Sequence, residues 1–220
     1  MTFTVGRPRH TPPRHEGLSP RDEILESAAQ LFTERGFGAT STRRIAEHVG
    51  MRQASLYHHF ENKDSILEAL LMSTIEGTLE TAERLRGAAT SPAAELYALV
   101  RWDAGQLLAA RWNLGALYTL PEVRGPRFAP FQRRRDRLRE RYRVLARAVA
   151  EDAGGPTDPA TLELPLRLAE TAIAQRTDGP VGDPRPVAAA LADAALRVLG
   201  ARPEQAARAA SRLPEPEPVP

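Results

Sequence analysis

The 220-residue sequence contains no cysteine, which excludes disulfide bonds, thiolate metal sites and cysteine nucleophiles. All five histidines lie within the first sixty residues, so residues 61–220 also lack the commonest general base. Neighbouring histidines such as His58 and His59 diverge by about 100° on a helix and cannot readily chelate one ion. No glycine-rich phosphate loop is present. These absences argue against an enzyme, and we expect neither a metal ion nor a cofactor.

Long hydrophobic runs are absent as well. No apolar stretch approaches the roughly 20 residues of a membrane span, and residues 1–5 do not resemble the core of a signal peptide. We therefore expect a cytoplasmic protein with no membrane partner. The net charge of +2 is nearly neutral, so bulk charge does not indicate a nucleic-acid partner. Lys63 is the only lysine among many arginines, a bias that a GC-rich coding genome explains.

The most informative stretch runs from Arg21 to Leu71. Ile45 and Val49 lie four residues apart and so face one side of a short helix. Gly50 follows, where a helix often ends with positive φ. Leu56 and Phe60 give the next short helix the same spacing. Two short amphipathic helices about a glycine turn indicate a helix-turn-helix, whose second helix can enter a DNA major groove.

The full string is more specific than this spacing, and it resembles the N-terminal domain of the tetracycline-repressor (TetR) family of dimeric transcriptional regulators. About fifty residues match without a gap. The matching segments are residues 24–32, 34–37, 40–42, 45–46, 49–50, 56–60 and 62–63. The departures lie at Met51, Arg52 and Ala54, and they leave the base preference open. The resemblance implies that a homodimer binds a palindromic operator in double-stranded DNA.

Candidate DNA contacts gather at the two short helices. The N-terminus of the first helix, with Thr42, can bind a phosphate, and Arg43 can donate two hydrogen bonds to a guanine. The remaining assignments come from the resemblance. It implies base contacts for two residues of the second helix and phosphate contacts for four others. The base contacts are Gln53 and Ala54, and the phosphate contacts are Ser55, Tyr57, His59 and Lys63.

Helical periodicity continues to about residue 200, and no segment reads as a strand. We therefore expect an all-α fold of about nine helices. Residues 1–18 are expected to form a disordered basic arm, either a solvated tail or a hook for the minor groove. Residues 19–65 form the helix-turn-helix domain, and residues 66–200 a ligand-binding and dimerisation domain. The proline-rich residues 201–220 are expected to be a disordered tail. A long helix opening at Asn62 links the two domains.

Two charged residues lie on apolar stripes of the second domain. Asp103 lies among apolar residues of the helix that follows Pro92, and Arg135 lies on the stripe of an arginine-rich helix from about Phe131 to Glu151. Buried charges need partners, so these residues either pair internally, lie at a helix end open to water, or anchor a small-molecule effector in an apolar pocket. The candidate effector contacts are Trp102, Asp103, Trp112, Asn113, Tyr118, Phe131 and Arg135.

The last two long helices carry apolar stripes with small residues, which permit close helix packing. By resemblance they form a four-helix bundle across a two-fold axis, with recognition helices about 34–36 Å apart or somewhat more. The expected interface residues are Leu162, Leu166, Ala169, Ile173, Leu191, Ala195 and Val198.

The resemblance implies a repressor released from its operator by a small apolar or amphipathic effector that moves the linking helix. An activator or a ligand-independent regulator of the same fold is the first alternative. An all-α enzyme or binding protein with a degenerate DNA domain is the second, and the intact run from Thr42 to Lys63 argues against it.

Overall fold

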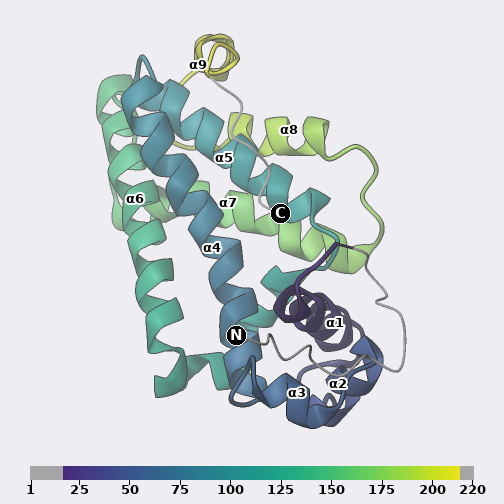
Figure 1. Cartoon of the computed structure of the whole chain (residues 1–220). Coiled ribbons are helices and arrows are strands. Elements are labelled where there is room, and N and C mark those ends of the chain that lie inside the picture. The colour runs from purple at the N-terminus through teal and green to yellow at the C-terminus, as the bar shows by residue number, and fades with distance from the viewer. Residues whose placement is uncertain (1–16, 214–220) are drawn as a thin grey trace, which may run out of the picture. The chain divides into compact units, whose positions relative to one another are not determined.

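The computed structural model describes residues 17–213, which form nine α-helices and three short 3-10 helices with no strand among them (Figure 1). The expected all-α fold is therefore confirmed. The expected basic arm lies mostly outside the described residues. None of the described helices is sufficiently long and apolar to cross a membrane.

The chain divides into two compact units, with the boundary after Leu70. The sequence placed this boundary five residues earlier, after residue 65. The first turns of the linking helix belong to the N-terminal unit, where Ile66, Leu67 and Leu70 are all buried. That helix, α4 (Lys63–Ala88), then continues into the C-terminal unit.

The N-terminal unit contains α1 (Pro20–Arg35), α2 (Thr42–Val49), α3 (Gln53–Tyr57) and the first turns of α4. The Ser19 side chain caps α1 and accepts a hydrogen bond from the Asp22 backbone N–H. Ser41 caps α2, and its hydroxyl accepts from the Arg44 N–H at 3.2 Å. Gly50 ends α2 in the left-handed conformation, with φ of 80°. These local signals set the helix-turn-helix.

The C-terminal unit contains the rest of α4 together with five further α-helices and three 3-10 helices. In chain order these are α5 (Pro92–Ala109), η1 (Leu114–Thr119), η2 (Pro121–Arg124), η3 (Pro126–Phe128), α6 (Ala129–Ala153), α7 (Pro159–Asp178), α8 (Pro184–Arg197) and α9 (Pro203–Ala210). Helix α5 packs against α6, α7, α8 and α9 and is central to the unit.

Helix α9 corrects the expected tail. Residues 203–210 are helical, and Ala206 and Ala210 are buried, so the expectation of disorder throughout 201–220 is wrong for this segment.

The backbones of two connections also meet closely in this unit. A Cβ on Gly155, in the α6–α7 connection, would collide with the carbonyl group of Leu199, in the α8–α9 connection.

Candidate nucleic-acid interface and interior polar network

Three polar side chains form a closed hydrogen-bonded triangle between the first residue of α2, Thr42, and the first and last residues of α3, Gln53 and Tyr57. The hydroxyl oxygens of Thr42 and Tyr57 are 3.1 Å apart. The Gln53 amide donates to the Thr42 hydroxyl at 3.0 Å and to the Tyr57 hydroxyl at 3.3 Å. Tyr57 is 49% exposed, although it is a large aromatic residue. The helix-turn-helix therefore brings three of its expected DNA contacts together and presents them at the surface.

An open cleft of about 450 Å³ adjoins this triangle. It is lined by residues 38–42, Tyr57 and residues 61–63. Lys63 lies in this lining, and its Nζ donates to the Phe37 carbonyl at 2.8 Å and lies 4.1 Å from the centre of the Phe37 ring. Hydroxyls, an ammonium group and the N-terminal amides of α2 are a donor set suited to a phosphate. Through these contacts with Phe37, Lys63 also holds the connection between α1 and α2 against the start of α4.

The other expected DNA contacts remain accessible. Ala54, Ser55 and His59 are exposed on α3 and just beyond it. Arg43 is exposed on α2, but its guanidinium pairs with Glu47 one turn later, with an Nε–Oε1 distance of 2.9 Å. An exposed pair of this kind contributes little free energy, so a guanine can replace Glu47 as the partner of Arg43 at small cost.

The interior of the C-terminal unit contains a buried polar network around Asp103. One carboxylate oxygen accepts from the Thr78 hydroxyl at 3.0 Å, and the other accepts from the Tyr142 hydroxyl at 2.7 Å. Asp103 on α5 is thus tied to α4 and to α6 by neutral donors. Burial raises its pKa to about 6, because a charge in an apolar interior is poorly solvated. Burial and the charge of Asp103 likewise raise the pKa of Tyr142 well above its ordinary value.

Arg135 also has an internal partner. Its guanidinium donates to Glu170 on α7 at 2.5 Å and lies 4.6 Å from the centre of the Tyr118 ring. The Tyr118 hydroxyl donates to Thr74 on α4 at 2.6 Å, and its ring lies 5.6 Å from that of Phe131. Three of the expected effector contacts are thus neighbours in the fold, and the polar groups of Arg135 and Tyr118 bond to the chain itself.

Of the remaining expected effector contacts, Trp102 lies on α5, and Trp112 and Asn113 lie in the connection between α5 and η1. The Asn113 amide donates to the Ile173 carbonyl at 3.0 Å and to the Thr177 hydroxyl at 3.2 Å, which fastens the start of η1 to α7. The Arg111 guanidinium lies over the Trp112 ring at 5.2 Å. The indole N–H of Trp102 is buried and has no hydrogen-bond partner among the described residues.

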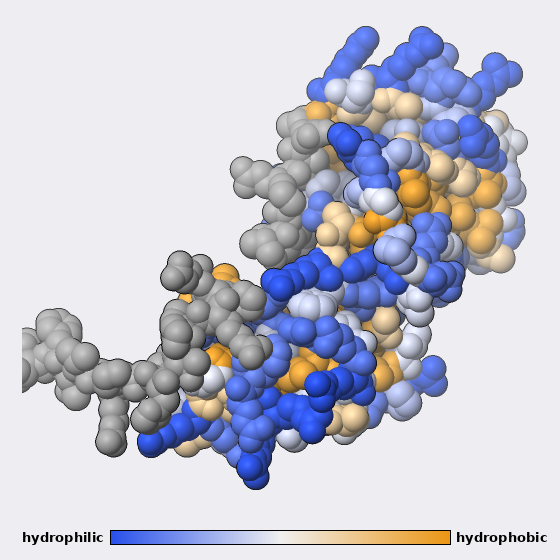
Figure 2. All heavy atoms as spheres, turned by 90° about the vertical axis from the view of Figure 1, so that its right-hand side faces the viewer, coloured by the Kyte–Doolittle hydropathy of each residue, from blue (hydrophilic) through white to orange (hydrophobic). Residues whose placement is uncertain are grey.

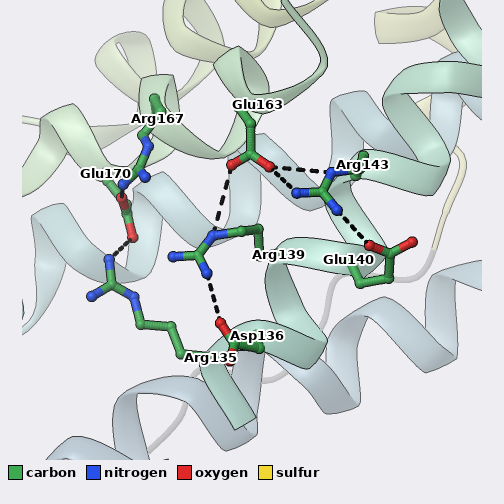
Figure 3. Close-up of polar contacts among 8 residues, drawn as sticks. All are labelled: Arg135, Asp136, Arg139, Glu140, Arg143, Glu163, Arg167 and Glu170. Carbon is green, nitrogen blue, oxygen red and sulfur yellow. Dashed lines mark hydrogen bonds and ion pairs between the residues drawn. The ribbon is translucent and has the colours of Figure 1, made fainter. Parts of the chain in front are cut away.

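An ion-pair ladder joins α6 to α7 along the arginine-rich helix. Figure 3 shows α6 and α7 lying antiparallel, with arginines of α6 reaching two glutamates of α7. Glu163 receives Arg143 and, at 3.7 Å, Arg139, while Glu170 receives Arg135. Within α6, Arg139 also pairs with Asp136 and Arg143 with Glu140.

The expected dimer residues need correction. Leu162, Leu166, Ala169 and Ala195 are buried inside the single chain, so their side chains cannot form a surface between two chains. The expectation is wrong for these four because an apolar stripe can face the chain's own core as well as a partner. The other three are half-buried, namely Ile173, Leu191 and Val198.

Figure 2 shows hydrophobic side chains reaching the surface among hydrophilic ones, and Val144 and Leu164 are exposed hydrophobic residues of this unit.

Sequence reasoning missed some members of the interior network. Thr74 and Thr78 lie four residues apart among the apolar positions of α4. Two hydroxyls at this spacing on a buried face could have indicated buried polar partners. Glu170 was missed because its partner is 35 residues away in the chain. Within residues 17–213 no group of three or more His, Asp or Glu side chains is placed to hold a metal ion.

Known proteins resemble this chain over both units. Residues 24–70 match the family model for bacterial regulatory proteins of the tetR family. The repressor KstR2 of Mycolicibacterium smegmatis is 38% identical over 81 residues, a match that spans 37% of this chain and 40% of KstR2. The negative transcriptional regulator IcaR of Staphylococcus aureus is 44% identical over 48 residues, a match that spans 22% of this chain and 26% of IcaR.

Solved structures extend the likeness to nearly the whole chain. The crystal structure of Mycobacterium smegmatis AmtR is 52% identical with a TM-score of 0.84, and the match covers 90% of this chain and 96% of AmtR. The structure of KstR2 of Mycobacterium tuberculosis, at 24% identity and a TM-score of 0.67 over 83% of this chain and 94% of that one, shares the fold. The protein is therefore a member of the tetR family of bacterial regulatory proteins.

Proposed function

We propose that the protein is a DNA-binding transcriptional repressor that binds a palindromic operator as a homodimer. The observation that carries this proposal is the triangle of Thr42, Gln53 and Tyr57 beside the cleft that contains Lys63. It presents groups that suit phosphates and base edges on the two helices of a helix-turn-helix. The curated relatives KstR2 and IcaR are named as a repressor and a negative regulator, which supports the direction of regulation.

The dimer surface is proposed on the faces of α7 and α8 that the single chain leaves accessible. On α7, Leu164 is exposed and Leu168 is half-buried; on α8, Leu191 and Val198 are half-buried at helical spacing. A two-fold axis through such a surface would relate the recognition helices of two copies. A symmetric dimer of this kind requires a symmetric operator.

Release by a small apolar or amphipathic effector in the C-terminal unit completes the proposal. A polar group of the effector would compete with Thr78 and Tyr142 for Asp103, or with Glu170 for Arg135. Any effector must bind one conformation more tightly than the other to shift the equilibrium. One observation favours a second candidate, a ligand-independent regulator: Asp103, Asn113 and Arg135 already have internal partners.

A footprint on the DNA upstream of the protein's own gene tests the proposal, at fixed salt because phosphate contacts are screened. We expect a protected palindrome. The double variant Tyr57→Ala, His59→Ala removes two exposed side chains and should weaken binding roughly tenfold or more, whereas Arg147→Ala, an exposed position on α6, should leave the affinity unchanged. A lack of protection by the native protein at low salt would overturn the regulator assignment. Protection that no small molecule relieves would favour the ligand-independent alternative.

A further inference from the structure

Arg43 and Glu47 form an ion pair that engages only one nitrogen of the guanidinium. The two residues lie four apart on α2, so their side chains share one face of the helix. The Arg43 Nε–H donates to Glu47 Oε1 at 2.9 Å. Among residues 17–213 no acceptor is hydrogen-bonded to the two terminal nitrogens of this guanidinium, Nη1 and Nη2. Four of its five N–H donors therefore remain available.

This pair begins at the end of α2 that adjoins α3. Thr42, the residue before Arg43, is hydrogen-bonded to Gln53, the first residue of α3. The side chains of Arg43 and Glu47 are 78% and 62% exposed. The first turn of α2 contains a second arginine, Arg44, and no acidic residue, so the arginines add to the positive end of the helix dipole. The Arg43 guanidinium is thus exposed close to the recognition helix, at an electropositive helix end.

Guanine is the base that the free nitrogens of Arg43 fit. Its major-groove edge presents two acceptors, O6 and N7, whereas the edge of each other base presents one acceptor at most. Nη1 and Nη2 can donate to O6 and N7 together, as a planar fork does, while the Nε–H stays bonded to Glu47. Although an exposed ion pair opens at small cost, a guanine does not require this pair to open.

We propose that Glu47 is a positioning residue that holds Arg43 for a guanine in the operator. Its carboxylate accepts the Nε–H and so restricts the rotation of the guanidinium before DNA binds. Less conformational entropy is then lost when Nη1 and Nη2 meet the base. This inference rests on the proposed DNA-binding function, and it adds a guanine in each half of the operator whose recognition depends on a carboxylate of the protein.

The charge of Glu47 acts differently on binding that does not depend on sequence. A carboxylate close to DNA repels the phosphates and lowers the affinity for every duplex. A charge with no positioning role would have this effect alone. A positioning residue also raises the preference for guanine over another base, and the two effects can be measured separately.

Competition between two duplexes tests the proposal with the full-length protein. Selection from a randomised duplex library first gives the bound palindrome, and Arg43→Ala identifies the symmetric pair of guanines whose preference it abolishes. The ratio of the Kd values for adenine and for guanine at this pair should be about tenfold or more for the native protein. Glu47→Ala should lower this ratio by about threefold, while the adenine duplex binds more tightly than it does to the native protein.

Glu47→Gln separates position from charge, because its amide oxygen can still accept the Arg43 Nε–H. This variant should keep most of the native ratio and bind both duplexes more tightly. Arg44→Ala removes an exposed charge one residue from Arg43 and should leave the ratio unchanged. On α6, Glu140→Ala removes a carboxylate from an exposed pair with Arg143 and should change neither the affinity nor the ratio.

Two outcomes would overturn the proposal while leaving the DNA-binding function intact. One is a selected palindrome that Arg43→Ala does not alter at any position. The other is a ratio for Glu47→Ala equal to that of the native protein, which would leave Glu47 with no positioning role. If the native protein enriches no sequence, the proposed function fails, and the assignment of Glu47 fails with it.

Discussion

Replacing Asp103 by asparagine should make the protein more stable at neutral pH and remove part of its pH dependence. Burial raises the pKa of Asp103 from an ordinary value of 3.8 to about 6. The folded state therefore binds more protons than the unfolded state between these two values, and stability falls as the pH rises through this window. The two values differ by about 2, and each pKa unit corresponds to about 1.4 kcal/mol, so the ionised carboxylate costs the fold about 3 kcal/mol above pH 6.

Asparagine has nearly the same shape and cannot ionise. Its carbonyl can accept from one of the two hydroxyls of Thr78 and Tyr142, and its amide can donate to the other, because a hydroxyl both donates and accepts. We therefore expect Asp103→Asn to raise the free energy of unfolding by about 1–3 kcal/mol at pH 8, with little effect at pH 4, since part of the gain is offset by imperfect hydrogen-bond geometry.

Urea unfolding of both proteins at a series of pH values from 4 to 8 measures this difference directly. Titration of other groups acts equally on the native protein and the variant, so the difference between the two curves isolates Asp103. The exposed carboxylate Asp136, changed to asparagine, is the control and should shift stability by less than about 0.5 kcal/mol. A variant that is less stable than the native protein by the same amount at pH 4 and pH 8 would refute the reasoning.

Two further changes test how the helices are held. Ser41→Ala removes the cap that accepts from the Arg44 N–H and should lower the free energy of unfolding by about 1 kcal/mol in urea titrations, whereas Ser41→Asp should retain most of it; equal losses in both would contradict the capping role. Gly155→Ala places a Cβ against the Leu199 carbonyl and should lower the melting temperature through a loss of about 1–3 kcal/mol. Gly182→Ala, whose Cβ meets open space, should leave the melting temperature unchanged.

The parts of the fold that could be predicted from the sequence are those with local causes. The turn at Gly50 and the buried residues Ile45 and Leu56 follow from spacing and backbone preference alone, and the structure confirms each of them. The helix-turn-helix forms within thirty residues of chain, so it can be predicted mainly from residues that are close in sequence.

The misses concern partners distant in sequence. Periodicity showed that Leu162 and Leu166 form a stripe, but the same stripe fits the chain's own core and a second copy equally well. The position of Arg135 on an apolar face indicated that its charge needs a partner, but only the folded structure shows that this partner is Glu170. Helix α9 was missed because its two buried alanines, Ala206 and Ala210, give a weak apolar signal in a proline-rich segment.

The spacing of residues along α4 matters independently of their identity. Its first turns belong to the N-terminal unit, and its later turns carry Thr74 and Thr78, which bond to Tyr118 and Asp103. A single helix is stiff, and each added residue turns it by about 100° and lengthens it by about 1.5 Å. One residue inserted between Thr74 and Thr78 would turn one threonine by about 100° relative to the other, so the two hydroxyls could no longer reach Tyr118 and Asp103 together. The four-residue spacing of the two threonines is therefore constrained by their partners within the C-terminal unit.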